Sequence, residues 1–170
     1  VQFVASMTCC VTVTGGTDGV VPLDGAKNAS AKNVYARLLA GSPTGQTDFV
    51  DGVGGAARFN ATNAIAATDN DYVFVASGQA VRIIAPDGTV RTIANKEQRT
   101  GTSVDGIGSG VTFAGNLVRG LYTNRAGTTL LVSTNSTIYR GQRSPNSDIM
   151  NPNSWFFQRV AGSTDGSVGD

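Results

Sequence analysis

One motif occurs three times along the chain. The string Asp51-Gly52-Val53-Gly54-Gly55-Ala56-Ala57-Arg58-Phe59 returns as Asp105-Gly106-Ile107-Gly108-Ser109-Gly110-Val111-Thr112-Phe113, and it starts again as Asp165-Gly166-Ser167-Val168-Gly169. The starts are about 54 and then about 60 residues apart, and an internal period of that size is typical of repeat proteins. We therefore expect copies of one structural unit. Phe59 and Phe113 should be buried at equivalent positions at the starts of successive units, and Phe74 and Leu131 should be equivalent in the second strands.

The fullest copy predicts four short strands, at residues 62–67, 72–76, 80–84 and 89–94. These runs are rich in β-branched and aromatic residues, and they are separated by turn sequences such as Ser77-Gly78 and Pro86-Asp87-Gly88. No stretch keeps a helical period, so the chain is expected to be all-β. Four strands per unit at this period indicate the blade of a β-propeller.

Several strings of this unit resemble an NHL repeat: Ala57-Arg58-Phe59-Asn60, Ala64-Ile65-Ala66, Val73-Phe74-Val75-Ala76, Val81-Arg82-Ile83 and Pro86-Asp87-Gly88-Thr89-Val90. The sequence departs from the family pattern at Thr62, where Pro is usual, and at Ser77, where Asp is usual. The second copy keeps Phe113 but little else of the first strand. The resemblance covers residues 34–170 well and residues 1–33 poorly. It implies a β-propeller, in a family that includes enzymes, RNA binders and adhesion domains, so it implies shape rather than activity.

The propeller template predicts about two complete four-stranded blades plus partial blades at both ends. Residues 1–42 form a partial blade with a long insertion at 15–33, with strands at 1–5, 9–13 and 34–39. Residues 43–95 form a complete blade, and residues 96–162 form another with an insertion at 141–154. Residues 163–170 start the next blade. On this template we expect a piece of a longer propeller rather than a self-sufficient oligomer.

Composition and charge exclude several classes of function. The chain has no histidine, which excludes histidine-based acid–base catalysis, Ser-His-Asp triads and His-ligated zinc within this segment. The lyase branch of the NHL family relies on metal-binding histidines and so loses its support. The net charge is +1 without a long charged run, which argues against nucleic-acid binding. No apolar run is long enough to span a membrane, so no membrane insertion of this segment is expected. No cofactor is expected either.

Two loops have a competing functional interpretation. Asp51-Gly52-Val53-Gly54-Gly55 has the glycines of a phosphate loop, but no helix and no Lys-Ser/Thr pair follow it. Asp69-Asn70-Asp71 has the spacing of calcium ligands, but it lacks the downstream glutamate of a calcium loop. We interpret both as turns.

The many Thr, Ser and Asn residues, with few Lys and Glu, favour a surface glycoprotein, whereas two cysteines do not define the compartment. Cys9 and Cys10 are adjacent, so on a strand they face opposite sides; they are either buried thiols or partners of cysteines outside this segment. Sequons begin at Asn28, Asn60 and Asn135. Asn28 falls in the long insertion and Asn135 at a hairpin tip, where a glycan would meet solvent, while Asn60 adjoins a strand.

The segment Trp155-Phe156-Phe157 allows two interpretations. It could be an aromatic ligand platform, or it could be the last strand of a blade with its large residues packed between neighbouring blades. We favour core packing.

The insertions 15–33 and 141–154 flank a blade whose corresponding connection is only the short turn 85–89. Strand connectivity in a propeller places all three on one end of the disc. Long loops are often functional, although these two could also be tolerated insertions. The predicted partner surface on them is Asp24, Lys27, Asn28, Arg143, Asn146, Asp148 and Asn151.

Together these features predict a non-catalytic, extracellular or cell-surface β-propeller module for protein binding, adhesion or structural assembly. NHL-like ectodomains of flagellar-attachment surface glycoproteins are one group that the chain resembles overall. Its partner would be another protein, the remaining blades of the same propeller, or glycans. One alternative is part of an NHL-propeller enzyme whose active residues lie in blades absent from this chain. Another is an RNA-binding propeller, which would need a basic face.

Overall fold

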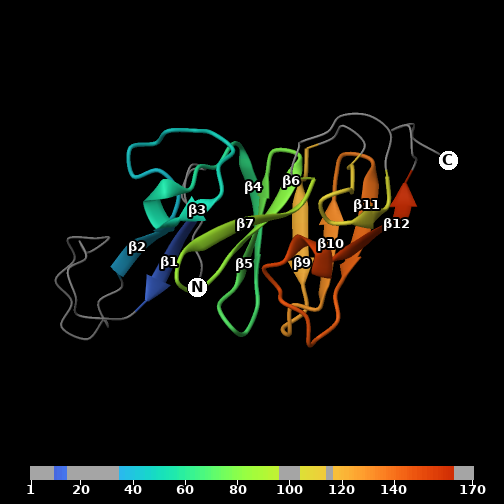
Figure 1. Ribbon diagram of the computed structural model, residues 1–170. Helices are drawn as coiled ribbons and strands as arrows, with labels where there is room; N and C mark the ends of the chain where they lie inside the picture. Colours follow the sequence, from blue (N-terminus) through green and yellow to red (C-terminus); the bar gives the residue numbers. More distant parts are fainter. Residues whose placement is uncertain (1–9, 15–34, 96–103, 114–116, 163–170) are drawn as a thin grey trace, which may run out of the picture.

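The computed structural model describes residues 10–14, 35–95, 104–113 and 117–162. Within these ranges the chain is all-β, with two five-stranded antiparallel sheets and one two-stranded sheet (Figure 1). The two-stranded sheet pairs β1 with β2, in antiparallel register. These two strands are Cys10–Thr14 and Tyr35–Ala40.

The first five-stranded sheet has the order β3-β7-β6-β5-β4. Its strands are β3 Gly52–Val53, β4 Thr62–Ala67, β5 Val73–Ser77, β6 Ala80–Ile84 and β7 Thr89–Ala94. Three of the four strands predicted for this unit have the expected bounds, and the second starts and ends one residue later than expected. A short 3₁₀ turn, Gly54–Ala56, follows β3.

The second five-stranded sheet repeats this order as β8-β12-β11-β10-β9. Its strands are β8 Gly106–Ile107, β9 Gly120–Thr123, β10 Thr129–Ser133, β11 Thr137–Gln142 and β12 Phe156–Gly162. A 3₁₀ turn, Pro152–Ser154, precedes β12. The expected insertion at 141–154 is therefore shorter, because Gly141 and Gln142 still belong to β11.

The prediction of four strands per unit was incomplete. In each unit the Asp-Gly motif adds a fifth strand of two residues, which pairs with the last strand of the same sheet. Each of these strands has only two residues, one of them glycine, so it shows no alternation of apolar and polar side chains. The sequence pattern therefore could not predict these strands. Each sheet is open, with the short strand at one edge and β4 or β9 at the other.

Each five-stranded sheet has a β-bulge between its last two long strands, and these bulges show which residues of the two sheets correspond. In the first sheet the register shifts between Val81 and Arg82, and in the second it shifts between Ile138 and Tyr139. Aligning the bulges makes Arg82 equivalent to Tyr139, and Phe74 equivalent to Leu131, as predicted. Bulges displace a strand locally, so a shared bulge is a specific sign of a shared unit.

Phe59 and Phe113 are 1% and 0% exposed, which confirms their predicted burial. They follow equivalent bridges, Val50 with Arg58 and Val104 with Thr112. Phe74 and Leu131 differ, however, with exposures of 0% and 37%. Phe74 faces the second sheet, whereas Leu131 faces away from the first, so equal positions in the unit have unequal surroundings.

The main core lies between the two five-stranded sheets. Phe74 from the first sheet meets Trp155 edge to face, with ring centroids 5.4 Å apart. Trp155 stacks on Phe157 at 6.1 Å, and Phe113 meets Tyr139 at 4.9 Å. Trp155 and Phe157 are fully buried, which confirms core packing for these two residues, whereas Phe156 is 51% exposed.

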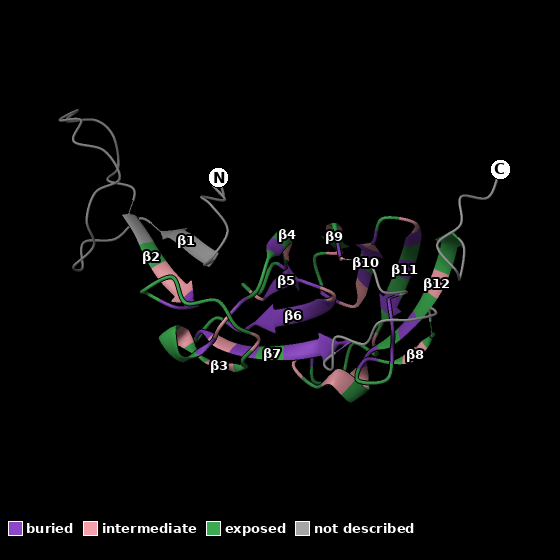
Figure 2. Cartoon of the chain, turned by 90° about the horizontal axis from the view of Figure 1, so that it is seen from above, coloured by how far each residue is buried: buried purple, intermediate pink, exposed green. Residues whose placement is uncertain are grey.

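A second core covers the opposite face of the first sheet. It joins Phe59, Val75 and Ile84 with Ala40 from β2. The first sheet is therefore covered on both faces, and Figure 2 shows β6 buried along its length and β7 buried over its second half. The strands β4 and β9, which begin the meanders of the two sheets, lie beside each other.

Candidate binding groove

A tight turn connects β6 to β7 and forms one wall of a groove. The turn depends on Gly88, whose φ of +86° favours glycine and whose Cβ would lie 2.8 Å from the carbonyl oxygen of Leu39. The Asp87 carboxylate accepts a hydrogen bond from the backbone N–H of Thr89 at 2.8 Å. This bond lowers the pKa of Asp87 below its ordinary value, so the carboxylate is ionised at neutral pH.

The loop between β11 and β12, residues 143–155, forms the opposite wall. Arg143 holds the start of this loop, because its guanidinium donates to the carbonyl oxygens of Gly127, Ser144 and Ser147 at 2.8, 3.0 and 2.7 Å. The guanidinium also lies 5.9 Å from the ring centroid of Trp155. Burial lowers the pKa of Arg143, and the nearby Asp148 carboxylate opposes that shift.

The end of the loop is fixed by hydrogen bonds between residues close in sequence. The Asp148 carboxylate accepts from the backbone N–H of Met150 at 2.9 Å, and the Asn151 side chain accepts from the N–H of Asn153 at 3.0 Å. The indole N–H of Trp155 donates to the carbonyl oxygen of Ile149 at 2.9 Å. Ile149 itself is buried in the core between the sheets. The loop is therefore part of the fold.

Between these walls lies a groove of about 530 Å³, which we call the turn–loop groove. Its charged side chains are Asp87, Arg91 and Asp148, and Met150 adds an apolar surface. The remaining lining residues are Ala85, Thr89, Asn151 and Pro152. Carboxylates, a guanidinium, an amide and a thioether can bind a polar, charged surface by ion pairs and hydrogen bonds. Within the described ranges, no group of three or more His, Cys, Asp or Glu residues is placed to hold a metal ion.

The predicted partner surface is only partly brought together. Asp148 and Asn151 line the turn–loop groove, and Asn146 is exposed on the same loop. Arg143 serves the loop itself, as described above. Asp24, Lys27 and Asn28 lie outside the described residues.

Six of the eight lining residues were not among the predicted partner residues. They are Ala85, Asp87, Thr89, Arg91, Met150 and Pro152. Arg91 belongs to β7 and is the cross-strand partner of Ile83, so it stands on the face that the second sheet partly covers, and its own side chain is exposed. Asp87 lies in the turn 85–89, which the propeller template had placed at the same end as the loop, and the folded chain shows that Asp87 itself lines the groove.

Of the two loops with a competing interpretation, residues 69–71 form a turn, whereas residues 51–55 contain the short strand β3 and the start of a 3₁₀ turn. Both carboxylate oxygens of Asp51 serve the fold: Oδ1 pairs with the buried guanidinium of Arg82 at 2.8 Å, and Oδ2 accepts from the N–H of Thr92 at 3.0 Å. Residues Asp69 to Asp71 form the hairpin turn between β4 and β5, in which the N–H of Thr68 donates to the carbonyl oxygen of Tyr72.

The candidate modification sites are distributed over the chain. Asn135 is exposed in the β10–β11 turn, where its side-chain oxygen accepts from the Arg119 Nε–H at 2.8 Å. Asn60 is exposed before β4, and its backbone N–H donates to the Ser77 hydroxyl oxygen. Asn28 and Cys9 lie outside the described residues, and Cys10 begins β1 opposite Ala40.

Comparison with protein-family models and with curated proteins found no match to this chain. In the part of the chain that the structure describes, no helix has the length and apolar character needed to cross a membrane.

Proposed function

We propose that this chain is a non-catalytic module of an NHL-like β-propeller that binds another protein at the turn–loop groove. The observation that carries this proposal is that the two walls of the groove come from different sheets. One is a tight turn of the first sheet and the other is an anchored loop of the second, so the groove exists only because two successive units pack together.

The arrangement of the sheets supports a propeller. Both sheets are antiparallel meanders with the same strand order, and their first long strands, β4 and β9, lie beside each other. Propeller blades repeat one four-stranded meander around a central channel, with the first strand of each blade innermost. In that geometry the β6–β7 turn and the β11–β12 loop lie at the same end of the disc, where they meet in the turn–loop groove.

The chemistry of the groove supports a protein partner. Protein surfaces offer charges of both signs together with apolar side chains, and Asp87, Asp148, Arg91 and Met150 match that mixture. The exposed sequon residues Asn60 and Asn135 support an extracellular or cell-surface location, where the module would serve in adhesion or assembly.

The proposal is tested with the double variant Asp87→Asn/Asp148→Asn. Asparagine keeps the side-chain oxygen that accepts from the N–H groups of Thr89 and Met150, so the turn and loop should keep their conformation. Removing two negative charges should weaken binding of the fluorescently labelled chain to intact cells of its source by about tenfold. The measurement is flow cytometry over a range of chain concentrations.

The matched control is Asp48→Asn/Asp69→Asn, which removes two exposed carboxylates that do not line the groove. Cell binding of this control should equal that of the unchanged chain. Equal binding by the groove variant and the control would contradict the proposal, provided that both show the circular dichroism spectrum of the unchanged chain.

A further inference from the structure

We infer that the face of the second sheet directed away from the first sheet is a docking surface for a further sheet of the same repeat. Large apolar side chains emerge on this outer face from all five strands of the sheet. They are Ile107, Tyr122, Leu131, Ile138, Phe156 and Val160, with exposures of 50%, 60%, 37%, 43%, 51% and 48%. Exposed apolar side chains gathered on one sheet face mark an interaction surface.

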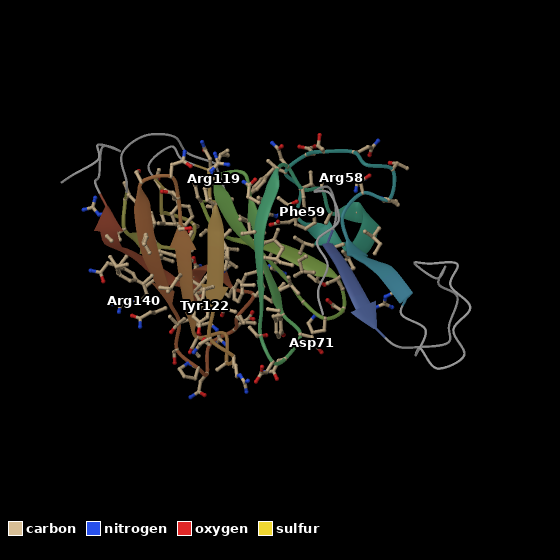
Figure 3. The ribbon with its side chains drawn as sticks, turned by 180° about the vertical axis from the view of Figure 1, so that it is seen from behind. Arg58, Phe59, Asp71, Arg119, Tyr122 and Arg140 are labelled. Atoms are coloured by element: carbon tan, nitrogen blue, oxygen red, sulfur yellow. The ribbon has the colours of Figure 1, made fainter. Side chains whose placement is uncertain are left out.

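Strand register places these side chains on one face. Tyr122, Leu131 and Arg140 are successive cross-strand partners on β9, β10 and β11. Gln142, Phe156 and Ile107 form the next row, two residues along the strands and hence on the same side. Figure 3 labels Tyr122 and Arg140 on the second sheet, well away from Phe59 in the first.

The first sheet shows what such a face does in this fold. Aligned by the bulges, Leu131, Ile138 and Val160 stand where the first sheet has Phe74, Val81 and Ile93. Ile93 and Val160 are the extra residues of the two bulges. All three residues of the first sheet are 0% exposed, because the second sheet covers them. The outer face of the second sheet is thus equivalent to the face of the first sheet that carries Phe74, Val81 and Ile93, but no sheet covers it.

The occupant we infer is the sheet of a third unit. The surface that covers the first sheet is the aromatic face of the second, which presents Tyr139, Trp155 and Phe157. The motif that begins each unit is present once more after β12, as Asp165-Gly166-Ser167-Val168-Gly169. A third unit with an equivalent aromatic face would continue an interface that the chain already contains.

Charge argues against a second copy docked face to face. Arg140 stands at the centre of the outer face, at the position of the buried Ile83 in the first sheet. The cross-strand rows described above contain no acidic residue, so two outer faces would bring together guanidinium groups without a carboxylate. A third unit needs only an acceptor opposite Arg140. The setting of Arg82, between carbonyl oxygens, a carboxylate and two phenylalanine rings, shows that this fold can enclose a guanidinium.

The inference does not depend on the turn–loop groove, and it is tested by thiol labelling. In a Cys9→Ser/Cys10→Ser background, Leu131→Cys places one thiol on the outer face and Arg125→Cys places one on the exposed β9–β10 turn. Each variant is prepared in the 170-residue chain and in a chain whose residues 165–170 are replaced by a copy of residues 105–162. Maleimide labelling rates are then compared.

In the extended chain the Leu131→Cys thiol should react at least about tenfold more slowly, because a buried thiol reacts only when the sheets open. The Arg125→Cys rate should not change. A second extension uses a copy of residues 51–104 in case the first does not fold against the outer face. If neither extension protects Leu131→Cys, the inference is wrong. Concentration-dependent protection in the unextended chain would identify a second copy as the occupant and would also overturn it.

Discussion

At the scale of single residues, Arg82 connects the repeated motif to the strands that follow it. Its fully buried guanidinium lies between the rings of Phe49 and Phe59, at 4.9 and 4.5 Å from their centroids. It donates to Asp51 and to the carbonyl oxygens of Val50 and Arg58. Burial of a charge is tolerated only when such partners compensate its lost hydration.

We predict that Arg82→Met lowers the free energy of unfolding by about 3 kcal/mol, because the Asp51 carboxylate and two carbonyl oxygens lose their donor. The exposed Arg125→Met should change it by no more than about 0.5 kcal/mol. Urea denaturation followed by circular dichroism measures both. Equally small effects of Arg82→Met and Arg125→Met would show that the contacts of Arg82 do not hold the Asp-Gly motif in place.

The sequence could not reveal this role of Arg82. It stood among scattered cationic residues, and its partners are 24 to 32 residues away in the chain. The Gly-rich string was interpreted as a turn, but it forms the short strand β3 and a 3₁₀ turn. The use of Asp51 as the acceptor for Arg82 and Thr92 is a long-range feature. Sequence spacing shows periodic faces, whereas contacts between distant segments require the folded chain.

At the scale of elements, runs of strand-forming residues delimited by turn sequences were predicted well. The strands β4, β6 and β7 have the expected bounds because Asp-Asn, Ser-Gly and Pro-Asp-Gly turns delimit them. The short strands β3 and β8 were missed because their glycines give no periodicity. Asp148 and Asn151 of the loop line the groove, and both were predicted as partner residues. Arg91 and Met150 also line it, but only the folded chain identifies them.

The loop after β8 provides the prediction at this scale. A Cβ on Gly108 would lie 1.9 Å from the carbonyl oxygen of Ile93, whereas a Cβ on Gly110 would have its nearest neighbour at 3.5 Å. Gly108→Ala should therefore lower the free energy of unfolding by about 2–3 kcal/mol, since the backbone of β7 must move. Gly110→Ala should stay within about 0.5 kcal/mol. Similar thermal denaturation midpoints for the two variants would contradict the close approach of Gly108 to β7.

At the scale of the whole molecule, burial depends on neighbours and not only on the unit. The repeat correctly predicted that Phe74 and Leu131 correspond, yet one is enclosed and the other is open to solvent. The sequence pattern of one unit does not show which face of its sheet another sheet covers. The central claim is therefore that successive units pack face to face, so that the two sheets share one core.

The most direct test of that claim is a double-mutant cycle across the junction, with Phe74→Leu and Trp155→Phe. These rings meet edge to face from different sheets, so we predict a coupling energy of about 0.5–1.5 kcal/mol in urea denaturation. The control cycle pairs Phe74→Leu with Phe156→Leu, whose side chain lies on the outer face, and it should be additive. Additive effects of Phe74→Leu and Trp155→Phe would contradict the face-to-face packing of the two units.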